Sequence, residues 1–442
     1  MTHATSGRTL NLACLLAALA ASACGSDSGG GNGSTGGASG SGATGGGGTT
    51  ATGGGAGAGG SSAGGASAGG TSAGGGSGGG SGGGSAGAFA GDTRVDSGTK
   101  NAVSGSAHAA VAPDGTIYAV WVTDANGVML VRSKDGAKSF EAPITIQSSV
   151  KPLVSMARHP YVAATNTRVA VSFNDEAGTV YVYDSAAGGA LSFGSAKTAG
   201  ADVSTTFRDF PKPAFLGGSE LAVVWHGYPA SGARIFISRE TNAFKSDVVS
   251  GGAPGVPCEC CPLDVLEASG GNRVVAFRNN DANVREMWSA VATGGAAFSK
   301  WSAVSKSEGM VMTCPMQGPR LAEVGSKLWA VWSSRGSSGA GKVFQSTSTD
   351  GGLTWTSGES TGFDGDEPTI AVGASGKMYV TGVTGSSKSA MVTSADGKSW
   401  STASPLQVAD GALKTPQAQG TAGVAVLAAV STAGTVWVRR ME

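Results

Sequence analysis

The stretch Ser348-Thr349-Asp350-Gly351-Gly352-Leu353-Thr354-Trp355 predicts a tight turn between two β-strands. Gly351 and Gly352 adopt positive φ without a Cβ penalty, which a tight hairpin requires. Ser348 and Asp350 supply short oxygen acceptors for the amides of the turn itself. Trp355 begins the next strand with a large apolar face suited to packing against a neighbouring sheet.

Three weaker copies of this octet occur elsewhere in the chain. They are Ser133-Lys134-Asp135-Gly136 followed by Ser139 and Phe140, Ser394-Ala395-Asp396-Gly397 followed by Ser399 and Trp400, and Gly188-Gly189 followed by Ser192 and Phe193. The order of residue types resembles the Asp box (S-x-D-x-G-x-T-W) of the bacterial sialidase, or neuraminidase, repeat (BNR repeat). In that family the box is structural and lies away from the active site. The resemblance therefore implies a structural role, without catalysis, for Ser348, Asp350, Gly352, Thr354, Trp355, Asp135 and Asp396.

A unit of about 50 residues recurs from residue 89 onward. It is marked by apolar five-residue segments that begin at Ile117, Val169, Leu221, Val274, Leu328, Met378 and Val424. Each unit holds a short apolar segment, a turn, the marked segment, a polar loop, an alternating strand, the box turn and a poorer last strand. Four strands per unit without helical periodicity predict an all-β domain, a sialidase-like β-propeller, over residues 89–442.

We predict seven four-stranded blades, because seven units can be counted. The last unit ends after its third strand, at residues 436–439. Residues 89–97 resemble residues 140–146, which follow the first box, and we expect them to supply the missing strand and close the ring without free edges. Sialidases have six blades, so six blades is the alternative.

Residues 1–24 resemble a bacterial lipoprotein signal peptide. Arg8 precedes an apolar stretch, residues 10–21, that is too short to span a bilayer comfortably. It ends in Ala21-Ser22-Ala23-Cys24, which is similar to a lipobox, where Cys24 becomes the lipid-bearing N-terminus. Gly25 after the cysteine resembles lipoproteins sorted to an outer membrane, so we expect a lipid anchor in the cell envelope of a Gram-negative bacterium. The alternative is ordinary secretion.

Residues 25–88 are predicted to be a disordered linker. Glycine makes up about half of them, and Ser, Ala and Thr most of the rest. Without an apolar period, nothing can be buried to offset the entropy lost on ordering. A flexible coil of this length reaches about 40–50 Å, enough to hold a domain clear of a bilayer.

The charge balance excludes some classes of partner. Lys plus Arg and Asp plus Glu are both 30, so no basic field favours nucleic acid or an anionic membrane. We expect a monomer that touches the membrane only through its lipid. Trp121, Trp225 and Trp332 occupy the same place in their units and are predicted to fill the core between blades rather than to bind sugar.

Four cysteines remain in the body of the chain: Cys258, Cys260, Cys261 and Cys314. They lie in Cys258-Glu259-Cys260-Cys261-Pro262 and Cys314-Pro315-Met316-Gln317-Gly318-Pro319-Arg320, and these motifs resemble an uncharacterised branch of sialidase-like propellers. Four cysteines in an exported protein favour two disulfides. Three connectivities are possible, of which we favour Cys261–Cys314 with Cys258–Cys260. The alternative is a thiolate site for copper or zinc, and the sequence suggests no other cofactor.

No catalytic residue is assigned from the sequence. The resemblance to sialidases implies three arginines for a substrate carboxylate, a Tyr–Glu nucleophile pair and an aspartic acid–base, but this set does not transfer residue by residue. The favoured function is therefore binding of a glycan or a protein at the axial mouth, with an exo-glycosidase of sialidase type and a metal site at the cysteines as alternatives. The candidate contacts for hydrogen bonds or anions are Arg158, Arg208, Asp209, Arg278, Arg285 and Arg320.

Overall fold

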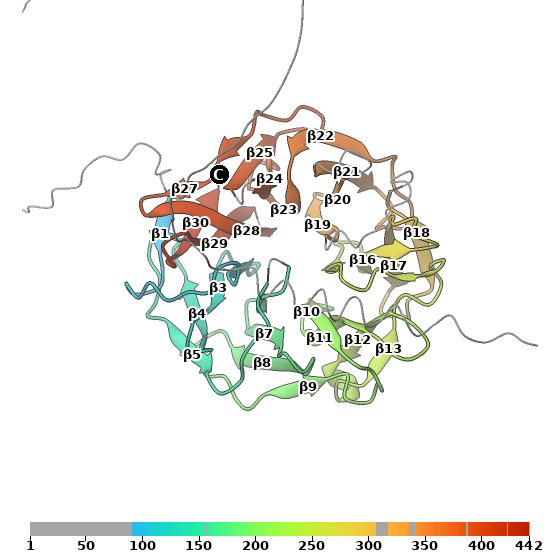
Figure 1. Ribbon diagram of the computed structural model, residues 1–442, viewed down its shortest axis with the longest axis horizontal. Coiled ribbons are helices and arrows are strands. Elements are labelled where there is room, and N and C mark those ends of the chain that lie inside the picture. Colours follow the sequence, from blue (N-terminus) through green and yellow to red (C-terminus); the bar gives the residue numbers. More distant parts are fainter. Residues whose placement is uncertain are drawn as a thin grey trace, which may run out of the picture. The chain divides into compact units, whose positions relative to one another are not determined.

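The computed structural model describes residues 91–441 except 156, 306–316, 336–340, 386–387 and 422. Seven antiparallel sheets surround a central axis in this part of the chain, as Figure 1 shows. The predicted all-β propeller with seven blades is confirmed, and six blades is excluded. Cys24, the signal segment 1–24 and the linker 25–88 lie outside the described residues.

Each blade has four principal strands, numbered here from the axis outward. Blades 1 to 3 are β2 (His108–Val111), β3 (Ile117–Val122), β4 (Val128–Ser133) and β5 (Ile144–Gln147); β6 (Tyr161–Ala164), β7 (Arg168–Asn174), β8 (Val180–Ala186) and β9 (Lys197–Ala199); and β10 (Arg208–Leu216), β11 (Glu220–Gly227), β12 (Arg234–Arg239) and β13 (Ser246–Val248). A 3-10 turn, η1 (Glu240–Asn242), follows β12.

Blades 4 to 6 follow the same order, with a short additional strand, β14 (Val256–Pro257), beside β16. Their strands are β15 (Asp264–Glu267), β16 (Asn272–Asn280), β17 (Met287–Thr293) and β18 (Lys300–Ala303); β19 (Arg320–Val324), β20 (Lys327–Ser334), β21 (Lys342–Ser348) and β22 (Glu359–Asp364); and β23 (Asp366–Val372), β24 (Met378–Thr384), β25 (Lys388–Ser394) and β26 (Ser404–Pro405).

Blade 7 joins the two ends of the described chain. Its strands are β28 (Gly411–Thr421), β29 (Val424–Ser431), β30 (Val436–Met441) and β1 (Asp92–Arg94), with β27 (Gln407–Val408) beside β28. β1 pairs antiparallel with β30, and Asp92 forms a buried ion pair with Arg439, with Oδ1 2.5 Å from Nε. The prediction that an N-terminal strand completes the last blade is confirmed.

The ring is continuous at its centre. Each first strand contacts the first strand of the next blade, and β28 contacts β2. Among the described residues, seven apolar clusters lie one between each pair of adjacent blades. Trp121, Trp225 and Trp332 are at most 2% exposed and belong to three of these clusters, so the predicted core role of these residues is confirmed.

The Asp boxes form closed hydrogen-bond networks. Ser348 Oγ donates to Asp350 Oδ1 at 2.7 Å and accepts from the amide of Gly352 at 2.8 Å, while both the amide and the hydroxyl of Thr354 donate to Asp350. Gly351 and Gly352 have φ of 70° and 89°, as the turn requires. Trp355 Nε1 reaches Ser289 Oγ of blade 4 at 2.9 Å, so the box also joins one blade to its predecessor.

Two of the three weaker copies, those at Asp135 and Asp396, build the same network. Ser133 and Ser394 donate to Asp135 and Asp396 at 2.8 and 3.1 Å, and both aspartates accept backbone amides from the turn. At Gly397 a Cβ would lie 1.9 Å from the ring of Trp329 in blade 5, so this turn too packs closely on the preceding blade. No segment among the described residues forms a helix long and apolar enough to span a membrane.

Candidate functional site

Six of the seven blades carry a proline in their first strand or within two residues before it. These are Pro160, Pro211, Pro262, Pro319, Pro368 and Pro416. Proline donates no backbone hydrogen bond, so it suits the innermost edge of a blade, where no further strand pairs.

In blades 3, 6 and 7 the register between first and second strand shifts at this proline. The residue just before it has φ of 50° at Phe210, 50° at Glu367 and 41° at Thr415. A positive φ is uncommon for residues other than glycine, and a bulge re-aims the neighbouring side chains. These irregularities therefore lie in the first, innermost strands of three blades.

Polar side chains from every blade gather around these prolines. The buried ones are His108, His159, Tyr161, Lys212, Asp264, Arg320 and Gln417, and Glu367 joins them with a buried Oε2. His108 and His159 stack with ring centroids 5.5 Å apart, and burial lowers the pKa of both well below its ordinary value, with Lys212 and Arg320 adding repulsion. These histidines are therefore neutral.

These buried polar side chains are called the axial cluster below, and two of them form an ion pair with each other. Lys212 Nζ forms an ion pair with Asp264 Oδ1 between blades 3 and 4, and Asp264 Oδ2 accepts the amide of Leu321 of blade 5 at 2.8 Å. Burial lowers the pKa of Lys212, and Asp264 opposes that shift. These contacts join three blades near the axis.

A pocket opens beside the paired groups. Eight residues line it: Ala157, Pro262, Gln317, Gly318, Arg320, Glu367, Pro368 and Gln417. They come from five different blades, so the pocket lies on the axis. Its closed volume is about 10 Å³, about the space that one water molecule needs and far less than the roughly 300–1,000 Å³ of a typical small-molecule site. It therefore admits one small chemical group.

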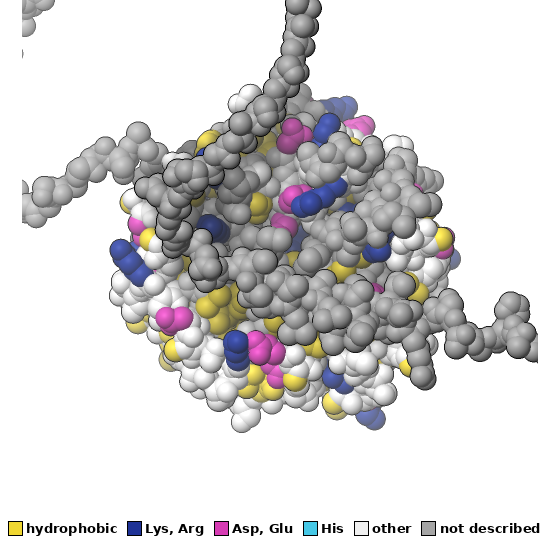
Figure 2. Space-filling model, in the orientation of Figure 1, with side chains coloured by type: hydrophobic (Ala, Val, Ile, Leu, Met, Phe, Trp, Pro, Cys, Tyr) yellow, Lys and Arg dark blue, Asp and Glu magenta, His cyan; other side chains and the backbone are white. Residues whose placement is uncertain are grey.

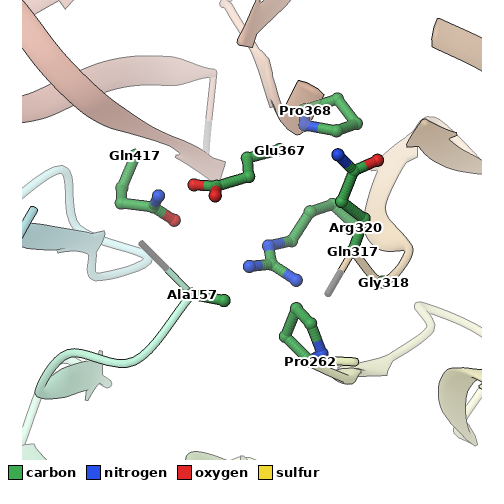
Figure 3. Close-up of a pocket in the computed structure, with 8 residues that line it drawn as sticks. All are labelled: Ala157, Pro262, Gln317, Gly318, Arg320, Glu367, Pro368 and Gln417. Atoms are coloured by element: carbon green, nitrogen blue, oxygen red, sulfur yellow. The ribbon is translucent and has the colours of Figure 1, made fainter. Parts of the chain in front are cut away.

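Arg320 is the cation of this pocket. Figure 3 shows its guanidinium extending into the middle of the space, with the side chains of Glu367 and Gln417 on the facing side. The residue is 7% exposed, and within the described part of the chain its guanidinium donates one hydrogen bond, from Nη1 to Pro319 O at 3.2 Å. No described carboxylate forms an ion pair with it, so its other donors face the pocket.

Glu367 is the acid of the pocket. Its Oε2 is buried without a hydrogen-bond partner in the structure, although the residue as a whole keeps partial exposure. Burial raises the pKa of Glu367 to about 7; Arg320 opposes the shift and Asp366 adds to it. The side chain therefore retains a proton to higher pH than an ordinary glutamate, and a protonated carboxyl group can both donate and accept a hydrogen bond.

A series of polar contacts connects the pocket to a half-exposed arginine. Gln317 Nε2 donates to Asp366 Oδ1 at 2.6 Å, and Asp366 also pairs with Arg335, whose side chain is half exposed, at 2.7 Å. Where side chains are coloured on the face in Figure 2, acidic and basic ones are interspersed.

The structure places the six candidate ligand contacts in different surroundings. Arg158 and Asp209 form a buried ion pair with each other at 2.6 Å. Arg208 donates to Gly200 O and Val203 O, both at 2.9 Å, and lies over Trp225. Arg320 lines the pocket.

The two remaining arginines brace blades 4 and 5. Arg278 donates to the carbonyls of Gln317, Arg285 and Ser333, and Arg285 Nη1 lies 3.0 Å from Cys258 Sγ. Arg320 is thus the member of the predicted set that faces the pocket.

The favoured disulfide pairing is wrong. Cys258 and Cys261 are thiols with their Sγ atoms 2.9 Å apart, while Cys260 is disulfide-bonded. The amide of Cys261 donates to Cys258 O at 3.3 Å, and this turn brings together the side chains three positions apart instead of Cys258 and Cys260. Cys314, the expected partner of Cys261, lies outside the described residues.

Sequence reasoning missed most of the axial cluster. Lys212, Asp264, Glu367 and Gln417 were not among the candidates. The signal that points to them is the proline that recurs at the blade starts, since each of these residues lies within two positions of it.

The catalytic set implied by sialidases is not assembled among the described residues. Arg158 and Arg278 are occupied by Asp209 and by backbone carbonyls. Tyr161 donates to Ala157 O at 3.1 Å, and burial raises its pKa, the opposite of what activates a nucleophile.

The fold and the axial pocket define the class of this protein as a seven-bladed β-propeller. Structures of similar fold include the BP39L lectin from Burkholderia pseudomallei, with a TM-score of 0.55 and 13% identity over 76% of this chain and 97% of the lectin. They also include the polysaccharide lyase Uly1, with a TM-score of 0.49 and 11% identity over 74% of this chain and 88% of the lyase.

A leech intramolecular trans-sialidase is similar as well, with a TM-score of 0.44 and 11% identity over 80% of this chain and 70% of the enzyme. No protein-family model matches the chain, and no curated protein matches it. The resemblance therefore concerns the fold.

Proposed function

We propose that this propeller binds a glycan at its axial pocket, with Arg320 as the contact for a carboxylate or a hydroxyl group of the sugar. The observation that supports the proposal is the guanidinium of Arg320, which is buried, faces the pocket and has one hydrogen bond to its own chain neighbour. A buried charge without a partner costs stability, and a ligand acceptor would offset that cost through charge-assisted hydrogen bonds.

The other groups of the pocket suit a sugar. Glu367 and Gln417 lie opposite Arg320 (Figure 3) and offer both donors and acceptors. The small volume suits one substituent of the sugar, with the rest of the glycan over the mouth near Arg335 and Asp366. A lectin is among the proteins of this fold, which makes a glycan the ligand class we favour over a protein.

Arg320→Gln tests the proposal directly. Glycan-array screening followed by calorimetric titration with the best acidic and neutral oligosaccharides measures binding by the wild-type chain. We expect the variant to bind about 10- to 100-fold more weakly, since a hydrogen bond to a charged group contributes about 1.5–3 kcal/mol. Arg440→Gln, at an exposed arginine of β30, is the matched control and should bind as the wild type does. Equal affinity of Arg320→Gln and wild type would refute the assignment, and an array without binders would favour a protein ligand.

A second candidate function is glycoside hydrolysis. Glu367 favours it, because a buried glutamate with a pKa near 7 is suited to general acid catalysis. The test is release of reducing sugar from the glycans that bind, with Glu367→Gln as the inactive variant. Binding without turnover by the wild-type chain would leave the lectin-like function.

We also propose that the propeller is a monomer held at the cell envelope by lipid on Cys24, with residues 25–88 as the tether. Support comes from the lipobox-like segment and the composition of the tether. Metabolic labelling with a fatty acid should mark the wild-type chain and not Cys24→Ser. Release of an unlabelled chain into the medium by both would favour ordinary secretion.

A further inference from the structure

Two cysteines meet in the turn that precedes blade 4. The amide of Cys258 donates to Arg278 O at 2.8 Å, and the amide of Cys261 donates back to Cys258 O at 3.3 Å. This turn brings the two Sγ atoms to 2.9 Å from each other, and both residues are 0% exposed. A disulfide bond is about 2.03–2.05 Å long, so the sulfur atoms are within about 1 Å of bonding distance.

The surroundings of the pair favour one negative charge. Arg285 Nη1 lies 3.0 Å from Cys258 Sγ. The hydrogen bond with Cys261, together with Arg285 and Arg278, lowers the pKa of Cys258 to about 7 against the effect of burial. Burial and the neighbouring sulfur raise the pKa of Cys261. The surroundings therefore favour the negative charge on Cys258 and the proton on Cys261.

Cys260 is chemically separate from this pair. It is already disulfide-bonded, whereas Cys258 and Cys261 are thiols. The sequence thus places one disulfide and one dithiol within four residues.

We propose that Cys258 and Cys261 form an oxidation site, at which a hydroperoxide converts the dithiol to a disulfide. The Cys258 thiolate attacks the terminal oxygen of the peroxide, giving a sulfenic acid and an alkoxide that takes up a proton. Cys261 sulfur then displaces the hydroxyl group of the sulfenic acid, and its thiol proton leaves with that group as water. The peroxide gains two electrons, the two sulfur atoms lose two, and the products are the disulfide, one alcohol and one water.

Hydrogen bonds and close packing hold the turn in place. Tyr228 Oη donates to Glu259 O inside the turn, and Arg278 joins the same region to Gln317 O at 2.9 Å. The backbone of Pro262 is packed directly on Gly318, where a Cβ would lie 1.6 Å from Pro262 O. Pro262 and Gly318 line the axial pocket, but the oxidation site does not depend on which ligand that pocket binds.

Denaturing alkylation and intact mass of the purified chain test the proposal. After mild reduction of the native protein, hydrogen peroxide should decrease the number of alkylated thiols by two and the unalkylated mass by two hydrogens. Cleavage after Glu259 separates Cys258 from Cys261, so the two fragments should stay joined until reduced. A pair found closed before any treatment is reduced first, and it supports the proposal only if peroxide then closes the same bond again.

Substitutions of single residues test which side chains carry out the oxidation. Cys258→Ser and Cys261→Ser should each abolish the loss of two hydrogens. Arg285→Gln keeps both cysteines and should raise the pKa of Cys258. Disulfide closure at pH 7 should then be about tenfold slower for each unit by which that pKa rises, and the pH profile of the rate should shift to higher pH. Arg234→Gln in blade 3 is the matched control and should not change the rate.

Three results would overturn the proposal. One is that both thiols stay alkylatable after peroxide, and another is that Cys258 gains oxygen while Cys261 stays a thiol. The third is that the mapped bond joins either cysteine to the partner of Cys260. Because the mapping uses the wild-type chain, the conclusion holds even if a serine variant fails to fold.

Discussion

Acidic side chains at the box turns and at the axis of this propeller have opposite titration behaviour. Hydrogen bonds from Ser139 lower the pKa of Asp135 to about 2, and amide hydrogen bonds from Ser399 and Lys398 do the same for Asp396. Burial instead raises the pKa of Glu367 to about 7, and its Oε2 has no partner. The aspartates of the boxes are hydrogen-bonded within their own turns, whereas Glu367 at the axis keeps a buried oxygen atom without a hydrogen-bond partner.

The same contrast separates two arginines of similar burial. Arg158 is 8% exposed and Arg320 is 7% exposed. Arg158 makes three hydrogen bonds to the carboxylate of Asp209, while Arg320 makes one to a backbone carbonyl. Complete pairing indicates a structural group, and incomplete pairing in a pocket indicates a group available to a ligand.

Replacing each of these arginines by glutamine should give the largest difference. Arg158→Gln leaves Asp209 buried without its cation and should lower the free energy of unfolding by about 3 kcal/mol. Arg320→Gln removes an unpaired buried charge and should change stability by less than about 1 kcal/mol, in either direction. Urea denaturation followed by tryptophan fluorescence measures both. Equal losses would show that Arg320 is as structural as Arg158.

Glu367→Gln should give the next largest effect, and only at high pH. Because the folded-state pKa of Glu367 is about 7 and the ordinary value is 4.5, the folded state holds the proton more tightly. The stability that this tighter proton binding contributes is fully present below pH 4.5 and is lost as the pH rises to about 7. Above pH 7 the variant should be more stable than the wild type by about 2 kcal/mol, a figure reduced for the partial exposure of the residue.

Thermal unfolding of both chains between pH 4 and 9 checks this expectation. The two curves should diverge between pH 4.5 and 7, with Glu359→Gln, at an exposed position of β22, as the control that follows the wild type. Parallel curves would mean that Glu367 does not titrate abnormally.

Asp350→Ala should have a smaller and local effect. The substitution removes the acceptor for the amide and hydroxyl of Thr354 and for Ser348 Oγ, so we expect a loss of about 1–2 kcal/mol. Asp364→Ala, an exposed carboxylate in the same blade, serves as control. Hydrogen exchange should show the loss at residues 348–356, and unchanged protection there would contradict a structural role for the box.

The sequence allowed prediction of the fold because its signals are local. Ser348, Asp350 and Gly352 bond mainly to one another, so the turn can be recognised from adjacent letters, and its repetition gives the number of blades. The N-terminal strand could be identified in the same way, since Asp92–Arg94 continues a repeat that β30 leaves unfinished.

The site could be predicted only in part because it is assembled from distant residues. Arg320 and Glu367 come from different blades, and whether an arginine is paired depends on contacts such as Arg158 with Asp209, which are 51 positions apart. The cysteine pairing failed for a related reason: the turn at Cys258 sets which sulfur atoms meet, and that turn is fixed by Arg278 of a neighbouring strand. Residue types alone do not determine such contacts.

The smallest expected effect is the response of the box turns to acid. Since the folded-state pKa of Asp396 is about 2 and the ordinary value is 3.8, its contribution to stability is present above pH 3.8 and is lost as the pH falls to about 2. Asp396→Asn keeps one oxygen acceptor for the turn and should remove this share of the acid sensitivity. Carboxyl carbon chemical shifts measure the titration directly, and an Asp396 midpoint near 3.8 would contradict the hydrogen-bond network. Because Glu367 weakens the fold as pH rises and Asp396 weakens it as pH falls, the two groups together favour a stability maximum near pH 4, between the two titrations.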